Sequence, residues 1–239
     1  MITTCSENKA PEPGKYLSLI RPFLIVFLFS LILLCSCQNT EKAYYSNGKP
    51  KFVITKNTFG KIDGEAKWWY ENGSLMLVGG YKNGLLDGLM TRYYENGNKQ
   101  TEDNYLQGKL NGLSKEMDLN GNVYTEKTYA NDTLNGMCRL YDGTGHLTEE
   151  GNYKNGYFDG DWNFYDRFGK LIATANFTHG TGIKKSWDAN GKISMTAEFQ
   201  NNLLHGKETW YDEAGRVVRI RTYDSGEMVS EKVIQSDQQ

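Results

Sequence analysis

Large apolar residues and polar residues alternate along strand-length segments through most of this chain, and short glycine-containing segments separate them. Alternation with a period of two residues is typical of β-strands, and Asn-Gly between two such segments favours a hairpin turn because both residues tolerate a positive φ. The turns recur in steps of 24, 24, 24, 24, 22 and 24 residues, as their glycines show: Gly73, Gly97, Gly121, Gly145, Gly169, Gly191 and Gly215. A second set of glycines recurs with the same steps: Gly64, Gly88, Gly112, Gly136, Gly160, Gly182 and Gly206. The pattern therefore predicts one β-hairpin in each 24-residue copy, closed by a tight turn at the first set of glycines, as in ENGN (95–98), and joined to the next copy by a second turn, as in KNGLLDG.

Columns of large side chains keep a constant distance from these glycines. One column is entirely aromatic: Tyr81, Tyr105, Tyr129, Tyr153, Phe177, Phe199 and Tyr223. Another lies five residues after each glycine of the second set: Trp69, Tyr93, Met117, Tyr141, Tyr165, Trp187 and Tyr211. A single hairpin cannot bury such columns, whereas stacked copies can. We expect an all-β fold, an elongated single-domain stack of about seven 24-residue hairpin repeats.

The repeat pattern bounds the predicted domain. It covers residues 44–228, of which 44–63 form a degenerate N-terminal cap, and we expect residues 229–239 to form a flexible tail. A two-residue deletion occurs once, between Phe177 and Gly182. Recurrent aspartates three residues before the turn glycine are expected to bond the backbone of the turn rather than to hold a cation: Asp118, Asp142, Asp166, Asp188 and Asp212.

The N-terminal part of the chain differs from the repeats. A run of twelve apolar or small residues extends from Phe23 to Leu34 after Arg21. This is the length of a signal-peptide core, and it is shorter than the roughly 20 residues that a membrane-spanning helix needs. The run ends in Leu34-Cys35-Ser36-Cys37, which resembles the lipobox of bacterial lipoproteins.

The lipobox resemblance implies how the chain is processed. A signal peptide would cover residues 1–36, cleavage would occur between Ser36 and Cys37, and Cys37 would carry the lipid, with residues 37–43 as a tether. Two or more acyl chains on one residue anchor a protein stably to a membrane. We therefore expect an exported bacterial lipoprotein, and Gln38 after the lipidated cysteine favours the outer membrane.

Composition and charge add limits on function. A net charge of −2 provides no electrostatic reason to expect a nucleic-acid partner, and 16 Tyr with 10 Phe and 5 Trp argue against a disordered chain. Cys138, the one cysteine outside the N-terminal segment, occupies a place that other copies fill with residues of several kinds, which favours packing over catalysis. The spacing of the three histidines indicates no catalytic set, no cofactor and no metal site, since they fall in turns of different copies: His146, His179 and His205.

The repeat resembles the MORN-variant repeat of bacterial YwqK-type proteins. The residues that carry the resemblance read GDWNFYDRFGKLIATANF, GLMTRYYENGNKQTEDNYLQGKLNG and GKETWYDEAGRVV. It covers about Tyr44 to Met228 and implies a rod of β-hairpins without enzymatic activity. Members are often labelled antitoxin components, and MORN repeats are associated with membranes and protein partners.

Candidate binding residues are large side chains that the columns do not explain. The place before the second column holds Trp68, Phe164 and Trp210 in three copies, and strand alternation puts it on the opposite face. Trp162 shares their parity. If the column forms the core, these four aromatics are at least partly exposed and suit anchors for a protein partner. The alternative is that a thin stack buries both faces.

Three functions fit these observations. The first is a non-catalytic, lipid-anchored envelope protein that recognises a protein partner, of unknown identity, through its repeat surface. The second is a cell-wall or carbohydrate-binding module, because the repeat is also similar to choline-binding cell-wall repeats and aromatic faces stack on sugars or amines. The third, implied by the family resemblance alone, is an immunity or antitoxin protein against an envelope or secreted toxin.

Overall fold

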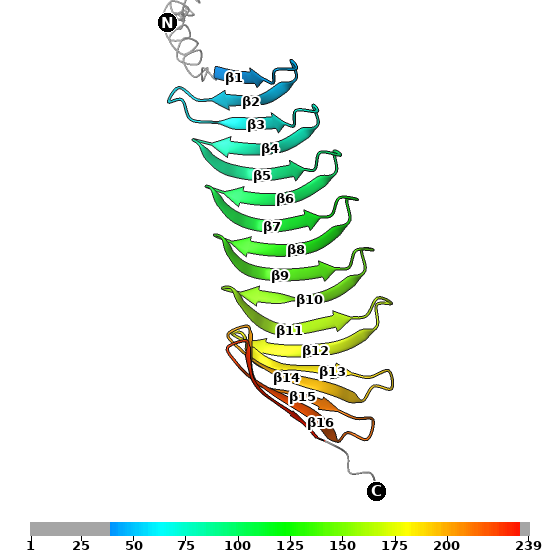
Figure 1. Ribbon diagram of the computed structural model, residues 1–239. Coiled ribbons are helices and arrows are strands. Elements are labelled where there is room, and N and C mark those ends of the chain that lie inside the picture. The colour runs from blue at the N-terminus through cyan, green and yellow to red at the C-terminus, as the bar shows by residue number, and fades with distance from the viewer. Residues whose placement is uncertain (1–38, 235–239) are drawn as a thin grey trace, which may run out of the picture.

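The computed structural model describes residues 39–234, which form a single antiparallel sheet of 17 strands without helices. Each strand pairs with the next one along the chain, so the sheet is an up-and-down meander that extends from β1 to β17 (Figure 1). The strands are β1 (Asn39–Tyr44), β2 (Pro50–Lys56), β3 (Gly64–Trp69), β4 (Leu75–Lys82), β5 (Leu85–Tyr93), β6 (Lys99–Leu106), β7 (Lys109–Met117), β8 (Val123–Ala130), β9 (Thr133–Tyr141), β10 (Leu147–Lys154), β11 (Tyr157–Tyr165), β12 (Leu171–Thr178), β13 (Thr181–Trp187), β14 (Ile193–Gln200), β15 (Leu203–Tyr211), β16 (Val217–Asp224) and β17 (Glu227–Val233). The predicted all-β stack of hairpin repeats is confirmed.

Two kinds of turn alternate along the sheet. The prediction that the tight turns are those with Gly97 and its equivalents is wrong. In the turn that contains Gly97, the Tyr94 N–H donates to the Asn98 carbonyl and only the glycine has a positive φ, of 89°. The tight turns, with two consecutive positive-φ residues, lie at the opposite ends of the strands, as at Asn83 and Gly84, with φ of 52° and 86°. The side chain of Asn96 instead donates to the Leu119 carbonyl of the next turn, at 2.8 Å.

The recurrent aspartates act as predicted. In Asp142, Oδ1 accepts hydrogen bonds from the backbone N–H groups of Thr144 at 2.8 Å and His146 at 3.0 Å. The other four make the same pair of bonds two and four residues ahead: Asp118, Asp166, Asp188 and Asp212. Earlier copies place a tyrosine there, and the hydroxyl of Tyr94 donates to the Met117 carbonyl of the next repeat at 2.9 Å.

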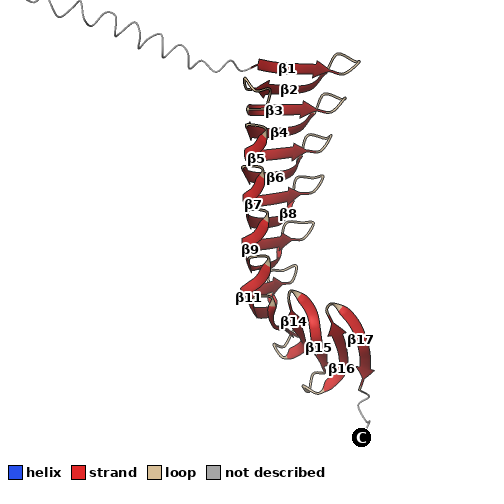
Figure 2. Ribbon diagram, turned by 90° about the vertical axis from the view of Figure 1, so that its left-hand side faces the viewer, coloured by secondary structure: helices blue, strands red, loops and turns tan. Residues whose placement is uncertain are grey.

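A bulge recurs where one repeat joins the next. Between β4 and β5, Gly79 pairs with Met90 but Tyr81 pairs with Leu86, so three residues of β5 face one of β4. The junction between β12 and β13 has no such shift, since Phe177 pairs with Gly182 and Ala175 with Lys184. The two residues deleted from the sequence are therefore the two extra residues of this bulge. Bulges bend and twist a strand, and the stack turns at β12–β14 after a straight course from β1 to β11 (Figure 2).

The two faces of the sheet carry different side chains. We call the face with Tyr81, Tyr105, Tyr129 and Tyr153 the tyrosine face, and the opposite one the ladder face. The ladder face carries alternating ion pairs, in which Lys115 Nζ lies 2.8 Å from Glu126 and Arg139 Nε lies 3.4 Å from Glu150. Glu126 and Glu150 also accept bonds from the hydroxyls of two members of the second aromatic column, Tyr141 and Tyr165.

The main core cluster lies on the tyrosine face near the bend. Cys138, Trp162, Ala175 and Phe177 are buried there, and Tyr153, Phe158, Phe164, Leu140 and Phe199 pack against them. The second aromatic column lies on the ladder face, and of its members only Met117 is buried. Trp162 is 3% exposed, so its predicted exposure is wrong. The reason is that the place two residues after the glycine is buried in five copies, where it holds Ala66, Met90, Ser114, Cys138 and Trp162.

Both predicted ends of the repeat domain need correction. Residues 229–233 belong to β17, where Arg219 pairs with Val233, and are not part of a flexible tail. Residues 39–43 belong to β1, where Lys42 pairs with Val53, and are not a tether. Strand pairing uses backbone groups, so it continues past the last recognisable repeat. The signal peptide, the Ser36–Cys37 cleavage site and the Cys37 lipidation site lie outside the described residues.

Candidate binding surfaces at the bend

An aromatic groove lies on the tyrosine face of β8–β14, with a volume of about 410 Å³. Its walls include Trp162 and Phe164 from β11, together with residues of the neighbouring strands. The groove is lined by Lys127, Cys138, Leu140, Glu149, Tyr153, Phe158, Trp162, Phe164, Phe177, Lys184 and Phe199. Clefts of about 300–1,000 Å³ with mostly apolar walls and a few polar groups are typical of binding sites.

The aromatic wall forms because two positions lack a side chain. A Cβ on Gly151 would lie 2.1 Å from Trp162 Cδ2, so only glycine leaves room for the indole. The indole N–H donates to the Asn152 carbonyl at 3.1 Å. Gly182 separates Phe177 from Phe199 in the sheet, and these two rings meet at 5.5 Å. Phe158 completes the wall, with its ring 4.7 Å from Trp162.

Lys184 gives the groove a charged group on an apolar surface. Its Nζ lies 3.6 Å from the centroid of the Phe164 ring, a cation–π arrangement. Burial lowers the pKa of Lys184, and the charges of Glu149 and Glu208 partly oppose this without a hydrogen bond to either. Burial also raises the pKa of Tyr153 to about 12, so its hydroxyl stays neutral. The groove thus offers an ammonium group beside aromatic rings.

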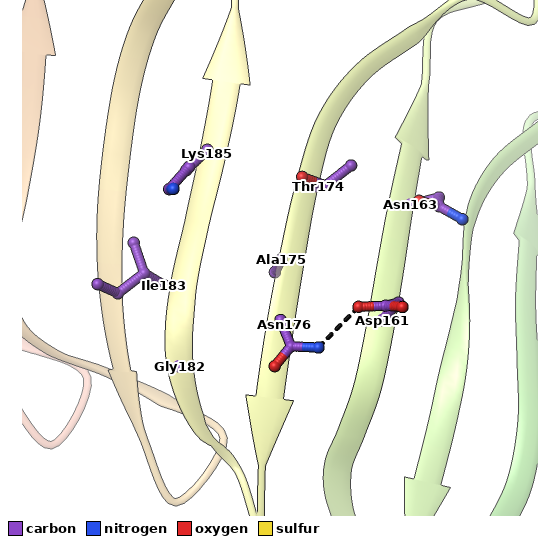
Figure 3. Close-up of a pocket in the computed structure, with 8 residues that line it drawn as sticks. All are labelled: Asp161, Asn163, Thr174, Ala175, Asn176, Gly182, Ile183 and Lys185. Atoms are coloured by element: carbon purple, nitrogen blue, oxygen red, sulfur yellow. Dashed lines mark hydrogen bonds between the residues drawn. The ribbon is translucent and has the colours of Figure 1, made fainter.

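A second hollow, of about 660 Å³, lies on the ladder face of the same strands (Figure 3). We call it the polar pocket; it is lined by Asp161, Asn163, Thr174, Ala175, Asn176, Gly182, Ile183 and Lys185. Asn176 Nδ2 donates to Asp161 Oδ1 at 2.7 Å, and these two residues pair across β11 and β12. Adjacent residues of β11 therefore serve opposite surfaces, with Asp161 in the pocket and Trp162 in the groove.

The sequence-predicted aromatics do not form one site. Trp162 and Phe164 share the groove, but Trp68 lies on β3 with its ring 6.2 Å from Tyr81. Trp210 lies on β15, where the guanidinium groups of Arg219 and Arg221 sit 5.6 and 5.1 Å from its ring. All four are on the tyrosine face, and Trp68, Phe164 and Trp210 are half-buried.

Lys184 and Asn176 were missed by sequence reasoning. For Lys184 the signal available was its departure from the equivalent places of other copies, such as Ala66 and Met90. Asn176 gives no such signal, because the same place holds Asn104 and Asn152. Comparing copies place by place could have found Lys184, but its position over Phe164 depends on the pairing of β11, β12 and β13.

The remaining chemistry-bearing residues take part in local contacts. His146 lies against Thr144 and Asp142, and the ring of His179 stacks on Tyr157 at 3.8 Å. Cys138 is buried, and burial raises the pKa of its thiol. Within residues 39–234 no group of three or more potential metal ligands is present. In the same range, no helix has the length and apolar character needed to cross a membrane.

Comparison with known proteins identifies the repeat. Five segments match the family described as MORN repeat variant: residues 62–83, 86–107, 134–155, 181–201 and 204–225. Each matched segment covers one hairpin closed by the longer turn, for example β3–β4 in the first. The hairpin β11–β12, which carries the aromatic wall, lies outside these segments. No curated protein matches the chain.

Proposed function

We propose that this MORN-repeat protein is a non-catalytic binding protein, anchored by lipid in the bacterial envelope, which recognises a protein partner through the aromatic groove. The repeats supply a long sheet in which each hairpin contacts its neighbours, and such rods commonly present extended binding surfaces. The lipid anchor at Cys37 rests on the lipobox resemblance.

The observation that carries the proposal is the groove with Lys184 at its wall. Large aromatic side chains in desolvated pockets are typical of the residues that dominate binding energy in protein interfaces. The ammonium of Lys184 forms no ion pair within the described part of the chain, while it lies on Phe164. The groove therefore suits a partner segment that inserts an apolar side chain and brings an acidic group to Lys184.

A cross-linking capture from membranes tests this proposal, with the full-length chain as bait. Lys184→Ala and Phe164→Ala should each reduce capture of a specific membrane or secreted protein at least tenfold. Lys185→Ala and Asn163→Ala are matched controls, because they change the neighbouring residue on the opposite face of the same strands and should leave capture unchanged. Circular dichroism of every variant shows whether the sheet has formed. The proposal is contradicted if no specific protein is captured, or if the unchanged chain and the four variants capture it equally.

A cell-wall or carbohydrate-binding role through exposed aromatics has less support on the tyrosine face. Trp162 is buried, and two arginines cover the ring of Trp210. The Trp162 indole therefore offers no open face to a sugar ring, and on Trp210 a sugar would compete with the two guanidinium groups. Retained co-sedimentation of the full-length chain with peptidoglycan, lost in Trp210→Ala, would reverse this ranking.

An immunity or antitoxin role is a special case of protein binding and rests on the resemblance to YwqK-type proteins. The captured protein tests it directly. A partner whose toxicity the full-length chain suppresses, and Lys184→Ala does not, would establish this role, and a partner without toxicity would remove it.

A further inference from the structure

We propose that the polar pocket on the ladder face binds a neutral, hydroxyl-rich small molecule of the saccharide class. This site is separate from the aromatic groove and does not depend on the proposed protein partner. Its volume of about 660 Å³ is within the range of small-molecule sites.

The side chains of the polar pocket form two rows that cross three neighbouring strands. In one row Asp161 pairs with Asn176, which pairs with Ile183. In the next row Asn163 pairs with Thr174, which pairs with Lys185. Residues directly opposite each other in neighbouring strands have Cβ atoms about 4.5–5.5 Å apart, so the polar ends form a close array over three strands. Figure 3 shows these side chains on β11, β12 and β13.

The chain's own repeats explain why a hollow forms there. The place of Asn163 holds Arg139 and Lys115 in the two preceding copies, and the place of Thr174 holds Glu150 and Glu126. In those copies long side chains join across the strands in ion pairs and cover the sheet. Shorter residues replace both members of the pair at β11–β12, so the surface is lower at this point.

The row closest to the two-residue turns changes in the same copy. Asp161 takes a place that Leu89, Leu113 and Met137 fill in the earlier repeats, all of them more than a third exposed. A place that holds an exposed apolar side chain in three earlier copies thus holds a carboxylate in the first copy without the ion pair. Both changes occur in one hairpin, which is the pattern expected of a site rather than of a repeating scaffold.

The chemistry of the pocket favours a neutral polyol. Asp161 and Lys185 carry opposite charges, so the lining has no net charge to attract an ion. The Asn176–Asp161 bond orients both side chains. Among the described residues, the remaining side-chain oxygens, Asp161 Oδ2 and Asn176 Oδ1, have no hydrogen-bond partner. Carboxylate and amide oxygens accept hydrogen bonds from hydroxyls and the amide N–H groups donate to them, while Ile183 offers apolar contact to the C–H groups of a sugar ring.

The test measures saturation-transfer NMR on the full-length chain in a detergent without a sugar headgroup. The probes are N-acetylglucosamine, chitobiose, cellobiose and maltose, with an acidic peptide for comparison. At least one saccharide should receive saturation from the protein. The double variant Asn163→Arg with Thr174→Glu restores the residues of the preceding copy, fills the hollow and should weaken binding at least tenfold.

Two further variants make the result specific. Asp161→Met also introduces the residue of the preceding copy and should weaken binding even if the double variant folds poorly. Ser186→Ala alters the opposite face of β13, outside the aromatic groove, and should leave saccharide binding unchanged. The proposal is overturned if no saccharide receives saturation, if the filled pocket still binds, if Ser186→Ala abolishes binding, or if the peptide alone binds at Asp161.

Discussion

The rings of Phe177 and Phe199 meet edge to face with centroids 5.5 Å apart, although the whole of β13 runs between their strands. Gly182 is the residue between them and pairs with both. In β5, the equivalent strand of a repeat that keeps the bulge, both a leucine and a glycine lie opposite column tyrosines: Leu86 pairs with Tyr81 and Gly88 with Tyr105. Loss of the bulge removes that leucine, so two column aromatics come into contact and close one end of the groove.

We expect Gly182→Ala to destabilise the protein by about 1–3 kcal/mol, as overpacking of a filled site does. A Cβ there would lie 2.1 Å from the Asn176 carbonyl oxygen and 2.7 Å from Phe177 Cδ1. Gly143→Ala is the control, because its Cβ would meet nothing within 4 Å and its φ is not positive. Thermal melts of both variants measure the difference, and equal melting temperatures would show that Gly182 is not confined.

The side chain of Asn202 should stabilise the bend. Its Oδ1 accepts from the Phe158 N–H and its Nδ2 donates to the Gly156 carbonyl, both at 2.8 Å, across the intervening turn. Asn202→Gly keeps the left-handed backbone but removes both bonds, so we expect a loss of about 1–3 kcal/mol. Asn201→Gly next to it, which also has a positive φ, should cost less than half as much in urea unfolding. A larger effect at Asn201 would count against this role.

Trp162→Ala should be among the most damaging single substitutions, at about 3–5 kcal/mol, because it empties the centre of the core cluster. Trp68→Ala removes a half-buried indole and should cost clearly less. Denaturant unfolding followed by circular dichroism measures both losses. Since neighbouring repeats stabilise one another, the transition of Trp162→Ala should also become less cooperative. Similar midpoints for the two variants would contradict the central position of Trp162.

The charge of Asp142 should stabilise its turn above the acid range. Bonds from Thr144 and His146 hold the pKa of Asp142 at about 2, below its ordinary value of 3.8. A carboxyl whose pKa is lower in the folded state contributes stability above the ordinary value and loses it as pH falls through the folded one. Asp142→Asn should therefore melt below the wild type at pH 7, and the two curves should converge between about pH 4 and 2. A constant gap over this range would exclude a role for the charge.

Much of the fold follows from local signals. The spacing of Gly73 and its equivalents predicts the turns because each of these glycines adopts a positive φ, which side chains disfavour. The bonds of Asp118 and the other turn acids were also predictable, since they join residues two and four apart. The positions of the two-residue turns were predicted wrongly, because Asn-Gly occurs in both kinds of turn and only the register distinguishes them.

The amino-acid sequence by itself determined the hairpin repeat, its period and the place where two residues are missing. Only the tertiary structure decided that Trp162 is buried, that Lys184 lies on Phe164, and that Asp161 joins Asn176 on the opposite face. The physical reason is that turn geometry depends on a few neighbouring residues, whereas burial depends on how successive strands are paired. One missing bulge at β12–β13 changes that pairing, and the groove and the pocket lie on the two faces of the strands around it.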